Sequence, residues 1–493
     1  PGRLLASRYR TKCLGMSLKQ AHTAPRPVIA PDLIDRLRAI VGPAGLITER
    51  ADMAPYLDEM RGLYRGDSPV IVRPASTAEV AAVVRACAAA GAPIVPQGGN
   101  TGLCGGAVAQ GEVIVSLGRM NKVRAIDPVN FTMTVDAGCV LADLQAYAAE
   151  HDRLFPLSLG AEGSCQIGGN LSTNAGGTAV IRYGNTRELT LGLEVVLPNG
   201  DIWDGLRGLR KNNTGYDLKH LFIGAEGTLG LITGAVVKLF PQPRARQTAM
   251  VALAGLDEAL DLLGRARRGS SDTIAAFELM PRIAFDISIR HIEGSIDPLD
   301  KPYDWYALIE FESDDDAGLA AMMERILGDA FEDGLVLDAA IAQSETQRKQ
   351  FWHIREAMVL AQTPEGASIK NDVSVPISAV PEFIRRAIAA VEALCPGIRP
   401  IAFGHVGDGN VHFNMQQPVG ADPQAFLARW DELNAPVMQI VSDMNGSFSA
   451  EHGIGLLKVE ELAADKSPVE MALMRTVKRA LDPAGLMNPG KML

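Results

Sequence analysis

The fold of this chain is decided by a glycine-rich stretch, residues 160–170, which reads GAEGSCQIGGN and is followed by TNAGG at 173–177. Glycine adds no apolar side chain to a core, and its backbone loses more freedom on folding than that of any other residue. A stretch this rich in glycine is therefore a poor core segment. It is typical of backbone that closely approaches a ligand, and we interpret residues 160–177 as a binding loop.

The first glycine loop in chain order, QGGNTGL at 97–103, follows a predicted βαβ unit. The unit has a strand at 69–72, a capped helix at 76–90 and a strand at 93–96. The loop is not a Rossmann fingerprint, because its glycine spacing is wrong and a strand at 113–117 follows where a helix should begin. It also lacks the GK[ST] of a P-loop. Its successive N–H groups can cradle pyrophosphate, although the loop alone is equally compatible with a tight turn.

A third loop of small residues favours ligand binding over a simple tight turn. NTGYDL at 213–218 leads into IGAEGTLGLIT at 223–233, and an apolar strand at 193–197 with a PNGD turn precedes it. Three such loops fed by strands predict one long ligand of the dinucleotide type, lying along backbone atoms.

Residues 404–414, GHVGDGNVHFN, predict a hairpin that carries two histidines. The Asp-Gly dipeptide at 408–409 favours a two-residue type I′ turn, because both central positions need positive φ. Such a turn places His405 opposite His412, with their Cβ atoms about 4.5–5.5 Å apart. Asn414 falls on the same face, since side chains alternate along a strand. The alternative is two ordinary histidines satisfied by hydrogen bonds.

A third histidine follows in SAEHGIG at 449–455, beside the carboxylate of Glu451. Two histidines and one carboxylate form the ligand set of a catalytic metal that keeps an open position. His452 can also be explained as a partner that only orients Glu451.

Length and composition limit the class of protein. The chain has 493 residues, 47% hydrophobic and 21% charged, which fits a globular protein of several domains. Its net charge of −11 argues against nucleic acid or an anionic membrane as the main partner. The six cysteines contain no CxxC pair, which suits a reducing compartment. No apolar run reaches the ~18 residues of a membrane helix, and we expect a cytoplasmic protein.

The first 31 residues are basic and contain no acid before Asp32. Such a leader is typical of a mitochondrial presequence, which would place the protein in the mitochondrial matrix. Added sequence ahead of a start at Met16 explains it equally well. We expect residues 1–31 to be disordered.

The loops together resemble a known family. GGNTGL, IGGN with TNAGG, GAEGTLG, GHVGDGNVHFN, SAEHGIG and the terminal NPGK resemble the FAD-linked oxidases of the vanillyl-alcohol oxidase fold, over roughly residues 50–493. The chain looks most like the branch of D-2-hydroxyglutarate and D-lactate dehydrogenases. Two segments favour a resemblance to D-2-hydroxyglutarate dehydrogenase within this branch: GSC before IGGN, and KNNTGYD at 211–217.

The resemblance implies an α+β protein with a two-subdomain FAD-binding domain and an α+β substrate-binding (cap) domain. We expect a leader at 1–31, the FAD-binding domain at 32–243 and the substrate-binding domain at 244–445. A C-terminal segment at 446–493 would return to the flavin and complete the active site. The PQPR run at 241–244 is a boundary signal in itself.

The resemblance also implies FAD in the glycine loops. Some relatives tether the flavin through a histidine in the first loop, but none lies between Gln97 and Gly106, so we expect noncovalent FAD. A thioether from Cys165 is the alternative, and small buried thiols are more often packing residues. The residues expected to bind FAD are Pro96, Gln97, Gly98, Gly99, Asn100, Thr101, Gly102, Gly163, Ser164, Ile167, Gly168, Asn170, Thr173, Asn174, Gly177, Gly230 and Ile232.

The active site is likewise assigned by the resemblance. His405, His412 and Glu451 would bind a divalent metal, expected to be zinc. His452 would take the proton from the substrate 2-hydroxyl. Asn414 would hydrogen-bond the hydroxyl or the C1 carboxylate.

A second carboxylate on the substrate would be bound by Arg355 and Lys370. The alternative for both is an ordinary surface charge. The family has a threonine four residues after the arginine, where this chain has Val359; Thr363, one helical turn on, can substitute.

We therefore expect oxidation of a D-2-hydroxy acid to the 2-oxo acid, with D-2-hydroxyglutarate favoured and D-lactate or another D-2-hydroxy acid as the alternative. A metal on the hydroxyl lowers its pKa, His452 can act as the base, and the flavin takes the hydride. A flavin-dependent transferase on the same fold and a metal-dependent hydrolase without flavin stay open. By resemblance the electron acceptor is an electron-transfer flavoprotein or a quinone. A homodimer is one of the open oligomeric forms.

Overall fold

The computed structural model describes residues 29–493, and this part of the chain forms two compact units. Unit 1 contains residues 29–175 together with Asn185–Gln242 and Glu451–Leu493. Unit 2 contains Gly176–Gly184 and Pro243–Ala450. Residues 1–28 of the leader predicted at 1–31 lie outside the described residues. The first helix among the described residues is α2 (Pro31–Val41).

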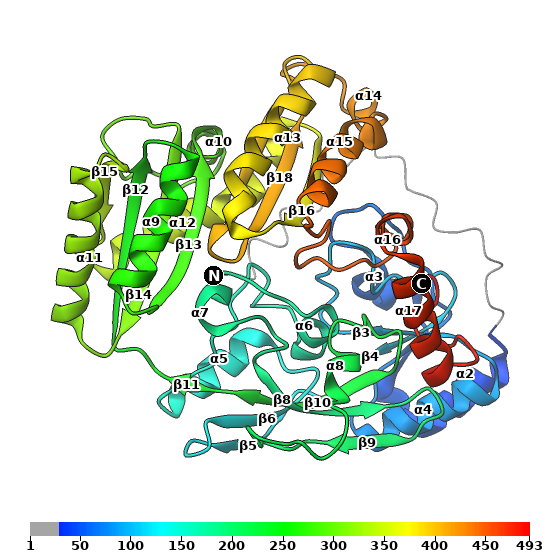
Figure 1. The fold of residues 1–493 in the computed structure, drawn as a ribbon. Helices are drawn as coiled ribbons and strands as arrows, with labels where there is room; N and C mark the ends of the chain where they lie inside the picture. Colours follow the sequence, from blue (N-terminus) through cyan, green and yellow to red (C-terminus); the bar gives the residue numbers. More distant parts are fainter. Residues whose placement is uncertain (1–28) are drawn as a thin grey trace. The chain divides into compact units, whose positions relative to one another are not determined.

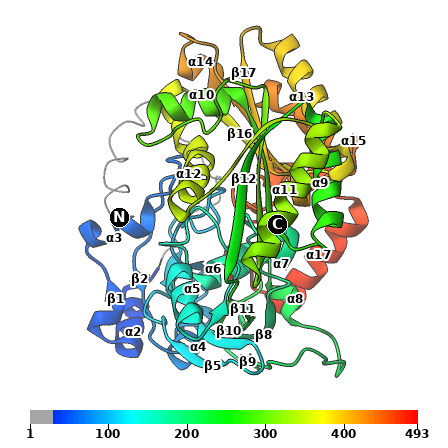
Figure 2. The same ribbon diagram turned by 90° about the vertical axis from the view of Figure 1, so that its left-hand side faces the viewer.

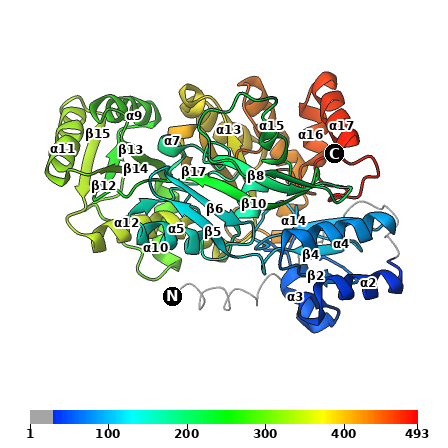
Figure 3. The ribbon, with the colours of Figure 1, turned by 90° about the horizontal axis from the view of Figure 1, so that it is seen from below.

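The first sheet of unit 1 confirms the predicted βαβ unit. Its strand order is β1-β2-β4-β3, and β2, β4 and β3 run parallel. Helix α4 crosses between β2 and β3; it begins after Ser76, whose hydroxyl accepts the N–H of Glu79 at 3.2 Å. Helices α2 and α4 pack side by side (Figure 3). The bounds are β1 (Leu46–Ile47), α3 (Arg50–Leu57), β2 (Ile71–Val72), α4 (Thr77–Ala89), β3 (Ile94–Gln97) and β4 (Val113–Ser116).

The second sheet of unit 1 is antiparallel, in the order β5-β6-β10-β8-β9, and the PNGD turn joins β8 to β9 as predicted. A two-stranded pair, β7 with β11, lies outside it. The bounds are β5 (Val123–Asp127), β6 (Thr132–Asp136), α5 (Leu141–Glu150), β7 (Arg153–Leu154), α6 (Ile167–Thr173), β8 (Thr190–Val196), β9 (Ile202–Gly205), α8 (Lys219–Phe222), β10 (Leu231–Lys238) and β11 (Phe240–Pro241).

Of the C-terminal segment predicted at 446–493, Glu451–Leu493 belong to unit 1 and residues 446–450 to unit 2. After α16 (Val459–Asp465) and α17 (Pro468–Leu481), drawn in red in Figure 1, Met487 forms a parallel bridge with Ile94 of β3. The N–H of Ile94 donates to Leu486, and that of Asn488 donates back to Ile94, both at 2.8 Å. The end of the chain therefore extends the sheet that leads into the first glycine loop.

Unit 2 is built on one seven-stranded sheet in the order β15-β12-β14-β13-β17-β18-β16. Its bounds are α7 (Val180–Tyr183), β12 (Ala245–Leu253), α9 (Leu256–Gly269), β13 (Ile274–Pro281), α10 (Arg282–His291), β14 (Trp305–Ser313), α11 (Asp316–Glu332), β15 (Val336–Ile341), α12 (Glu345–Ala361), β16 (Ser368–Ser374), α13 (Val380–Leu394), β17 (Arg399–His405), β18 (Asn410–Gln416), α14 (Pro423–Leu427) and α15 (Trp430–Asp443).

The two faces of this sheet are covered unequally. Helices α9, α11, α13 and α15 bury one face in a large apolar core. Helices α10 and α12 cover the other face in a smaller core that includes Met280, Ile401 and Phe403. Figure 2 shows the two helix groups on opposite sides of the strands. Because side chains alternate along a strand, the residues of β16 and β18 that point away from the larger core share a face with the smaller one.

The predicted register of the histidine hairpin is wrong. His412 pairs with Phe403, and not with His405. Residues Val406–Asp408 form a 3₁₀ turn, and Gly409 alone of the pair 408–409 has positive φ, 86°. The loop is thus longer than a type I′ turn, and the carboxylate of Asp408 accepts the N–H of Asn410 at 3.0 Å. His405 lies instead opposite Glu278 of β13.

Within residues 29–493, no helix combines the length and the apolar character needed to cross a membrane.

Candidate active site

A polar patch occupies the part of the unit 2 sheet where β16 pairs with β18. Lys370 lies opposite Asn414, and Asp372 lies opposite His412. Directly opposed residues of an antiparallel pair share one face, so these four side chains form a two-by-two array. We call them the β16–β18 array. Their neighbours in sequence, such as Val373 and Phe413, point into the large core on the other face.

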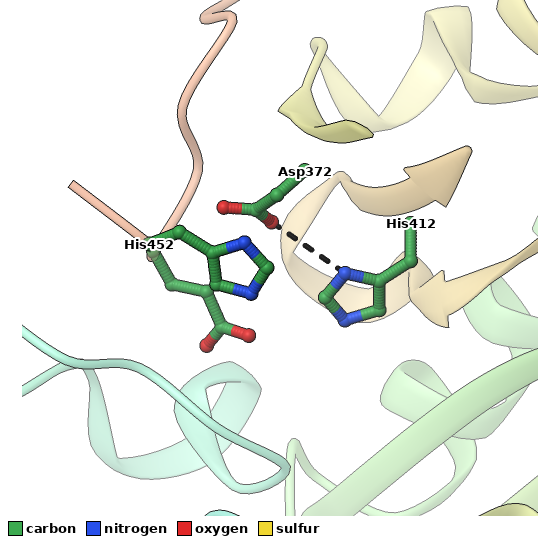
Figure 4. Close-up of side chains that lie close together, drawn as sticks. Asp372, His412 and His452 are labelled. Atoms are coloured by element: carbon green, nitrogen blue, oxygen red, sulfur yellow. Dashed lines mark ion pairs between the residues drawn. The ribbon is translucent and has the colours of Figure 1, made fainter. Parts of the chain in front are cut away.

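Asp372 is the one member of the array that the sequence did not predict. It is buried, and its Oδ1 lies 3.6 Å from Nδ1 of His412 (Figure 4). The side chain of Asn410 donates to the same oxygen at 2.9 Å. A carboxylate beside one ring nitrogen of a histidine orients the ring and directs its other nitrogen elsewhere. Only the cross-strand register brings Asp372 to His412.

A second carboxylate, Glu278 of β13, joins two of the predicted site residues. Its Oε1 lies 2.6 Å from Nδ1 of His405, and its Oε2 accepts bonds from Arg355 Nε at 2.9 Å and Nη2 at 2.8 Å. Burial would raise the pKa of Glu278, but the charges of His405 and Arg355 outweigh it and lower that pKa to about 2. Arg355 is only 6% exposed and stacks over Phe403, so it is not an ordinary surface charge.

Asn414 is held by a buried amide that the sequence analysis also missed. Its Nδ2 donates to Gln362 Oε1 at 2.8 Å, and Gln362 in turn donates to the carbonyl of Met358 in α12. Val359, the departure from the family pattern, lies on the same helix and is 47% exposed. Thr363 begins the short 3₁₀ helix that follows α12.

Four side chains offer metal-ligand atoms that all lie within 4.8 Å of one another: Asp372, His412, Glu451 and His452. The N–H of Ala450 donates to the carbonyl of Asp372 at 3.2 Å, so the backbone that precedes Glu451 runs beside β16. Imidazole nitrogens with carboxylate oxygens are a donor set that suits zinc. His405 is absent from this group, so the predicted set of His405, His412 and Glu451 remains a prediction.

In unit 1 the predicted flavin loops contact one another. A Cβ on Gly99 would lie 2.1 Å from the carbonyl of Ser164, and one on Gly98 would lie 3.5 Å from Gln166, so 97–102 packs against 163–168. The N–H of Gly224 donates to Leu171, which brings the GAEG part of the third loop to α6. Residues 212–218 of that loop instead line a hollow of about 970 Å³ beside β8 and β9.

Buried acceptor atoms in these loops fit a bound cofactor. Gln97 Oε1, Gln166 Oε1 and Asn170 Oδ1 have no hydrogen-bond partner within residues 29–493. A buried polar atom without a partner costs stability, so each of these atoms needs a donor from outside the described chain. The hydroxyl, amine and imide groups of FAD supply such donors, and the residues present therefore fit FAD.

Some of the other predicted cofactor residues have structural contacts of their own, whereas an added Cβ on Gly102 or Gly163 would meet no atom within 4 Å. Asn100 donates to the carbonyls of Pro55 and Asp58, and Asn174 Oδ1 accepts the N–H of Arg187. A Cβ on Gly230 would lie 2.9 Å from the carbonyl of Val196, which explains that glycine by packing. Gly177 lies in unit 2. Cys165 is buried, and burial raises the pKa of its thiol, as expected of a packing cysteine.

Comparisons with known proteins agree with this architecture. The chain matches the family models "FAD linked oxidases, C-terminal domain" over residues 242–492 and "FAD binding domain" over residues 68–205. It is 39% identical over 478 residues to the probable mitochondrial D-2-hydroxyglutarate dehydrogenase of Oryza sativa subsp. indica, covering 96% of this chain and 84% of that one. It is 39% identical over 448 residues to D-2-hydroxyglutarate dehydrogenase of Xanthomonas citri pv. viticola, covering 91% and 94%.

Among solved structures, p-cresol methylhydroxylase with substrate bound has a TM-score of 0.74 at 19% identity, covering 94% of this chain and 96% of that one. At this identity the likeness shows the fold alone. It confirms the predicted fold class, an FAD-binding domain followed by a mixed helix-and-sheet C-terminal domain.

Proposed function

Because the chain belongs to the FAD-linked oxidases, as an FAD-dependent dehydrogenase that acts on a CH–OH group, we propose that it oxidises D-2-hydroxyglutarate to 2-oxoglutarate. The observation that carries the choice of substrate is the β16–β18 array. It combines a cation, an amide, a histidine and the buried carboxylate of Asp372 on one face, with buried Arg355 on the helix that packs on that face.

The head of the substrate, its 2-hydroxyl and C1 carboxylate, is the part shared by every 2-hydroxy acid. Asn414 binds it by a hydrogen bond, with its amide orientation fixed by Gln362. His452 accepts the hydroxyl proton. A divalent cation, held by Glu451 and His412 with His405 or Asp372, would lower the pKa of that hydroxyl. FAD, when bound, supplies the acceptor for the hydride from C2.

The tail of D-2-hydroxyglutarate ends in a second carboxylate, which needs a local cation in a chain of net charge −11. Lys370 stands next to Asn414 in the array and supplies it. Arg355 contributes less than a free guanidinium, because Glu278 already accepts from Nε and Nη2. Its Nη1 is the nitrogen through which Arg355 adds a further hydrogen bond to the tail.

A screen of D- and L-2-hydroxy acids with the FAD-loaded protein under anaerobic conditions tests the proposal. We expect D-2-hydroxyglutarate to bleach the flavin spectrum fastest, with D-lactate slower and the L enantiomers inactive. Bleaching by D-lactate alone would favour the alternative of a D-lactate dehydrogenase. Absence of bleaching by every acid would contradict the proposal and favour a flavin-dependent transferase.

The expected electron acceptor is an electron-transfer flavoprotein or a quinone. The resemblance to the FAD-linked oxidases favours these acceptors over oxygen and NAD. Reoxidation of the bleached flavin by each acceptor in turn identifies it. The FAD is proposed to be noncovalent and the metal to be zinc. The compartment is proposed to be the cytoplasm, or the mitochondrial matrix if residues 1–31 act as a presequence; the rice relative carries a mitochondrial name.

A further inference from the structure

The carboxylate of Glu226 has no part in the chemistry described above, although it is buried in unit 1 between the flavin loops and the segment that follows His452. Glu226 is the acid in the GAEGTLG loop and is 8% exposed. Its Oε1 accepts the N–H of Ile454 at 2.6 Å, and its Oε2 accepts the N–H of Gly455 at 2.8 Å. One side chain thus binds two successive N–H groups of the HGIG turn.

The backbone of Glu226 indicates that this side chain is needed. Its φ is 51°, in the left-handed region that costs a non-glycine residue energy. Gly224 and Gly227 on either side adopt φ of 80° and 72°. A third glycine at position 226 would relieve the strain, so the carboxylate must contribute an interaction that glycine cannot make.

The main chain of Glu226 also makes two hydrogen bonds, as its side chain does. Its N–H donates to Ser172 at 2.8 Å, and its carbonyl accepts Asn488 Nδ2 at 2.7 Å. The same Asn488 nitrogen donates to Gly106, directly after the first glycine loop, at 2.9 Å. Glu226 therefore connects the GAEGTLG loop with Ser172 directly, and with Gly106 and the C-terminal segment through Asn488.

The turn bound by Glu226 is rich in glycine, whose backbone is conformationally permissive, so the position of the turn depends on the contacts that hold it. Gly453 and Gly455 have positive φ, 78° and 54°, and a Cβ on Gly453 would lie 2.8 Å from Glu226 Oε1. The N–H of Leu456 donates to the carbonyl of Cys104 at 2.8 Å. Burial raises the pKa of Glu226, while the N–H groups of Ile454 and Gly455 and the charge of Lys458 act in the opposite direction.

We propose that Glu226 is a positioning residue: it fixes the turn at 453–455 against the flavin loops and so sets the position of His452. This inference rests on the proposed function, in which His452 takes the substrate proton. A displacement of about 1 Å in a reacting group can cost on the order of 100-fold in rate, so a side chain that holds the adjacent turn controls kcat without touching substrate.

Glu226→Gln tests the proposal with almost no change in volume. Glutamine offers one acceptor oxygen and an NH₂ donor, so one of the two N–H groups loses its acceptor. Asp482 gives a matched control, because its buried carboxylate also accepts two successive N–H groups in unit 1, those of Leu486 and Met487 at 3.0 and 2.9 Å. Asp482→Asn removes the same kind of interaction from the C-terminal turn, and with it the ion pair between Asp482 Oδ2 and Lys478 Nζ at 2.6 Å, so it is the harsher of the two substitutions.

The first readout is amide hydrogen exchange of the FAD-loaded protein, which needs no turnover. In Glu226→Gln we expect faster exchange at 453–457 with wild-type FAD content. In Asp482→Asn we expect faster exchange at 485–488 and no change at 453–457. Unchanged exchange at 453–457 in Glu226→Gln would overturn the proposal. If that variant does not fold, Glu226→Asp, which keeps both oxygens on a shorter side chain, is measured in its place against the same expectation.

The second readout is the anaerobic rate constant of flavin reduction. We expect Glu226→Gln to lower it 10- to 100-fold, and Asp482→Asn to leave it within about threefold of wild type. In a His452→Ala background, Glu226→Gln should cause no further loss, because contributions that act through one group are not additive. The proposal would be overturned if Glu226→Gln lowered the rate constant by the same factor in the His452→Ala background as in wild type. It would also be overturned if the lower rate constant were fully explained by a lower FAD content. If D-2-hydroxy acids do not reduce even the wild-type flavin, the proposed function fails, and the exchange readout alone decides the role of Glu226.

Discussion

Glu278→Gln should destabilise unit 2 by about 3–5 kcal/mol, the usual cost of removing one partner from a buried ion pair. The side chain of Glu278 is 0% exposed and that of Arg355 7%, so the remaining guanidinium cannot recover its hydration. The variant is to be unfolded in urea with FAD in excess and followed by tryptophan fluorescence. Three tryptophans, Trp305, Trp352 and Trp430, report on unit 2.

A double-mutant cycle identifies the source of that loss. Arg355→Met leaves Glu278 paired with His405, and the double variant Glu278→Gln/Arg355→Met removes the uncompensated charge. The double variant should therefore lose about 1–3 kcal/mol less than the sum of the two single losses. Glu345→Gln at the start of the same helix, an exposed partner of Arg348, is the control and should cost under about 1 kcal/mol.

The pH dependence gives an independent check. The pKa of Glu278 is lowered to about 2 from an ordinary value of 4.5, so its contribution to stability is complete above pH 4.5 and disappears as the pH falls toward 2. The difference between wild type and Glu278→Gln should shrink over that range. A single-variant cost below about 1 kcal/mol, strict additivity, or a difference that stays constant down to pH 2–3 would refute this account of the buried pair.

Three further predictions concern the cofactor, the base and the metal. Acid precipitation should release FAD into the supernatant, because residues 97–106 contain no histidine to tether it; yellow colour retained in the pellet would contradict noncovalent binding. His452→Ala should lower the rate of flavin reduction by ~10²–10⁴-fold with FAD retained, and a loss under about tenfold would limit His452 to orienting Glu451. A strong chelator should abolish turnover and leave FAD bound, with zinc restoring the rate, because Asp372, His412, Glu451 and His452 group their ligand atoms within 4.8 Å. Full activity in metal-free protein would exclude a catalytic metal.

Local sequence signals predicted the elements that depend on neighbours in the chain. The Ser76 cap fixed the start of α4, and the PNGD turn fixed the join between β8 and β9. The glycines of the first two loops were recognisable because close backbone approach excludes any other residue, as at Gly99. The predicted hairpin register was wrong because Asp408 belongs to the 3₁₀ turn Val406–Asp408 and only Gly409 has positive φ, whereas a type I′ turn needs positive φ at both positions.

The residues missed by the sequence analysis are those whose partners come from distant strands or helices. Asp372 reaches His412 only through the β16–β18 register. Glu278 reaches Arg355 and His405 across 77 and 127 positions of sequence. A carboxylate within the apolar strand FELM was the available signal for Glu278, because an unpaired charge does not persist in a core. Its two partners could not be read from the sequence.

The most direct test of the proposed substrate is the ratio of kcat/KM for D-2-hydroxyglutarate to that for D-lactate, measured for wild type and for Lys370→Met. A charge-assisted hydrogen bond to the second carboxylate is worth about 1.5–3 kcal/mol, or roughly 10- to 100-fold in specificity. The wild-type ratio should therefore favour D-2-hydroxyglutarate by about that factor. Lys370→Met should lose most of this preference while kcat/KM for D-lactate changes less than about threefold. A wild-type preference for D-lactate, or equal losses on both substrates, would contradict a dicarboxylate bound at the β16–β18 array.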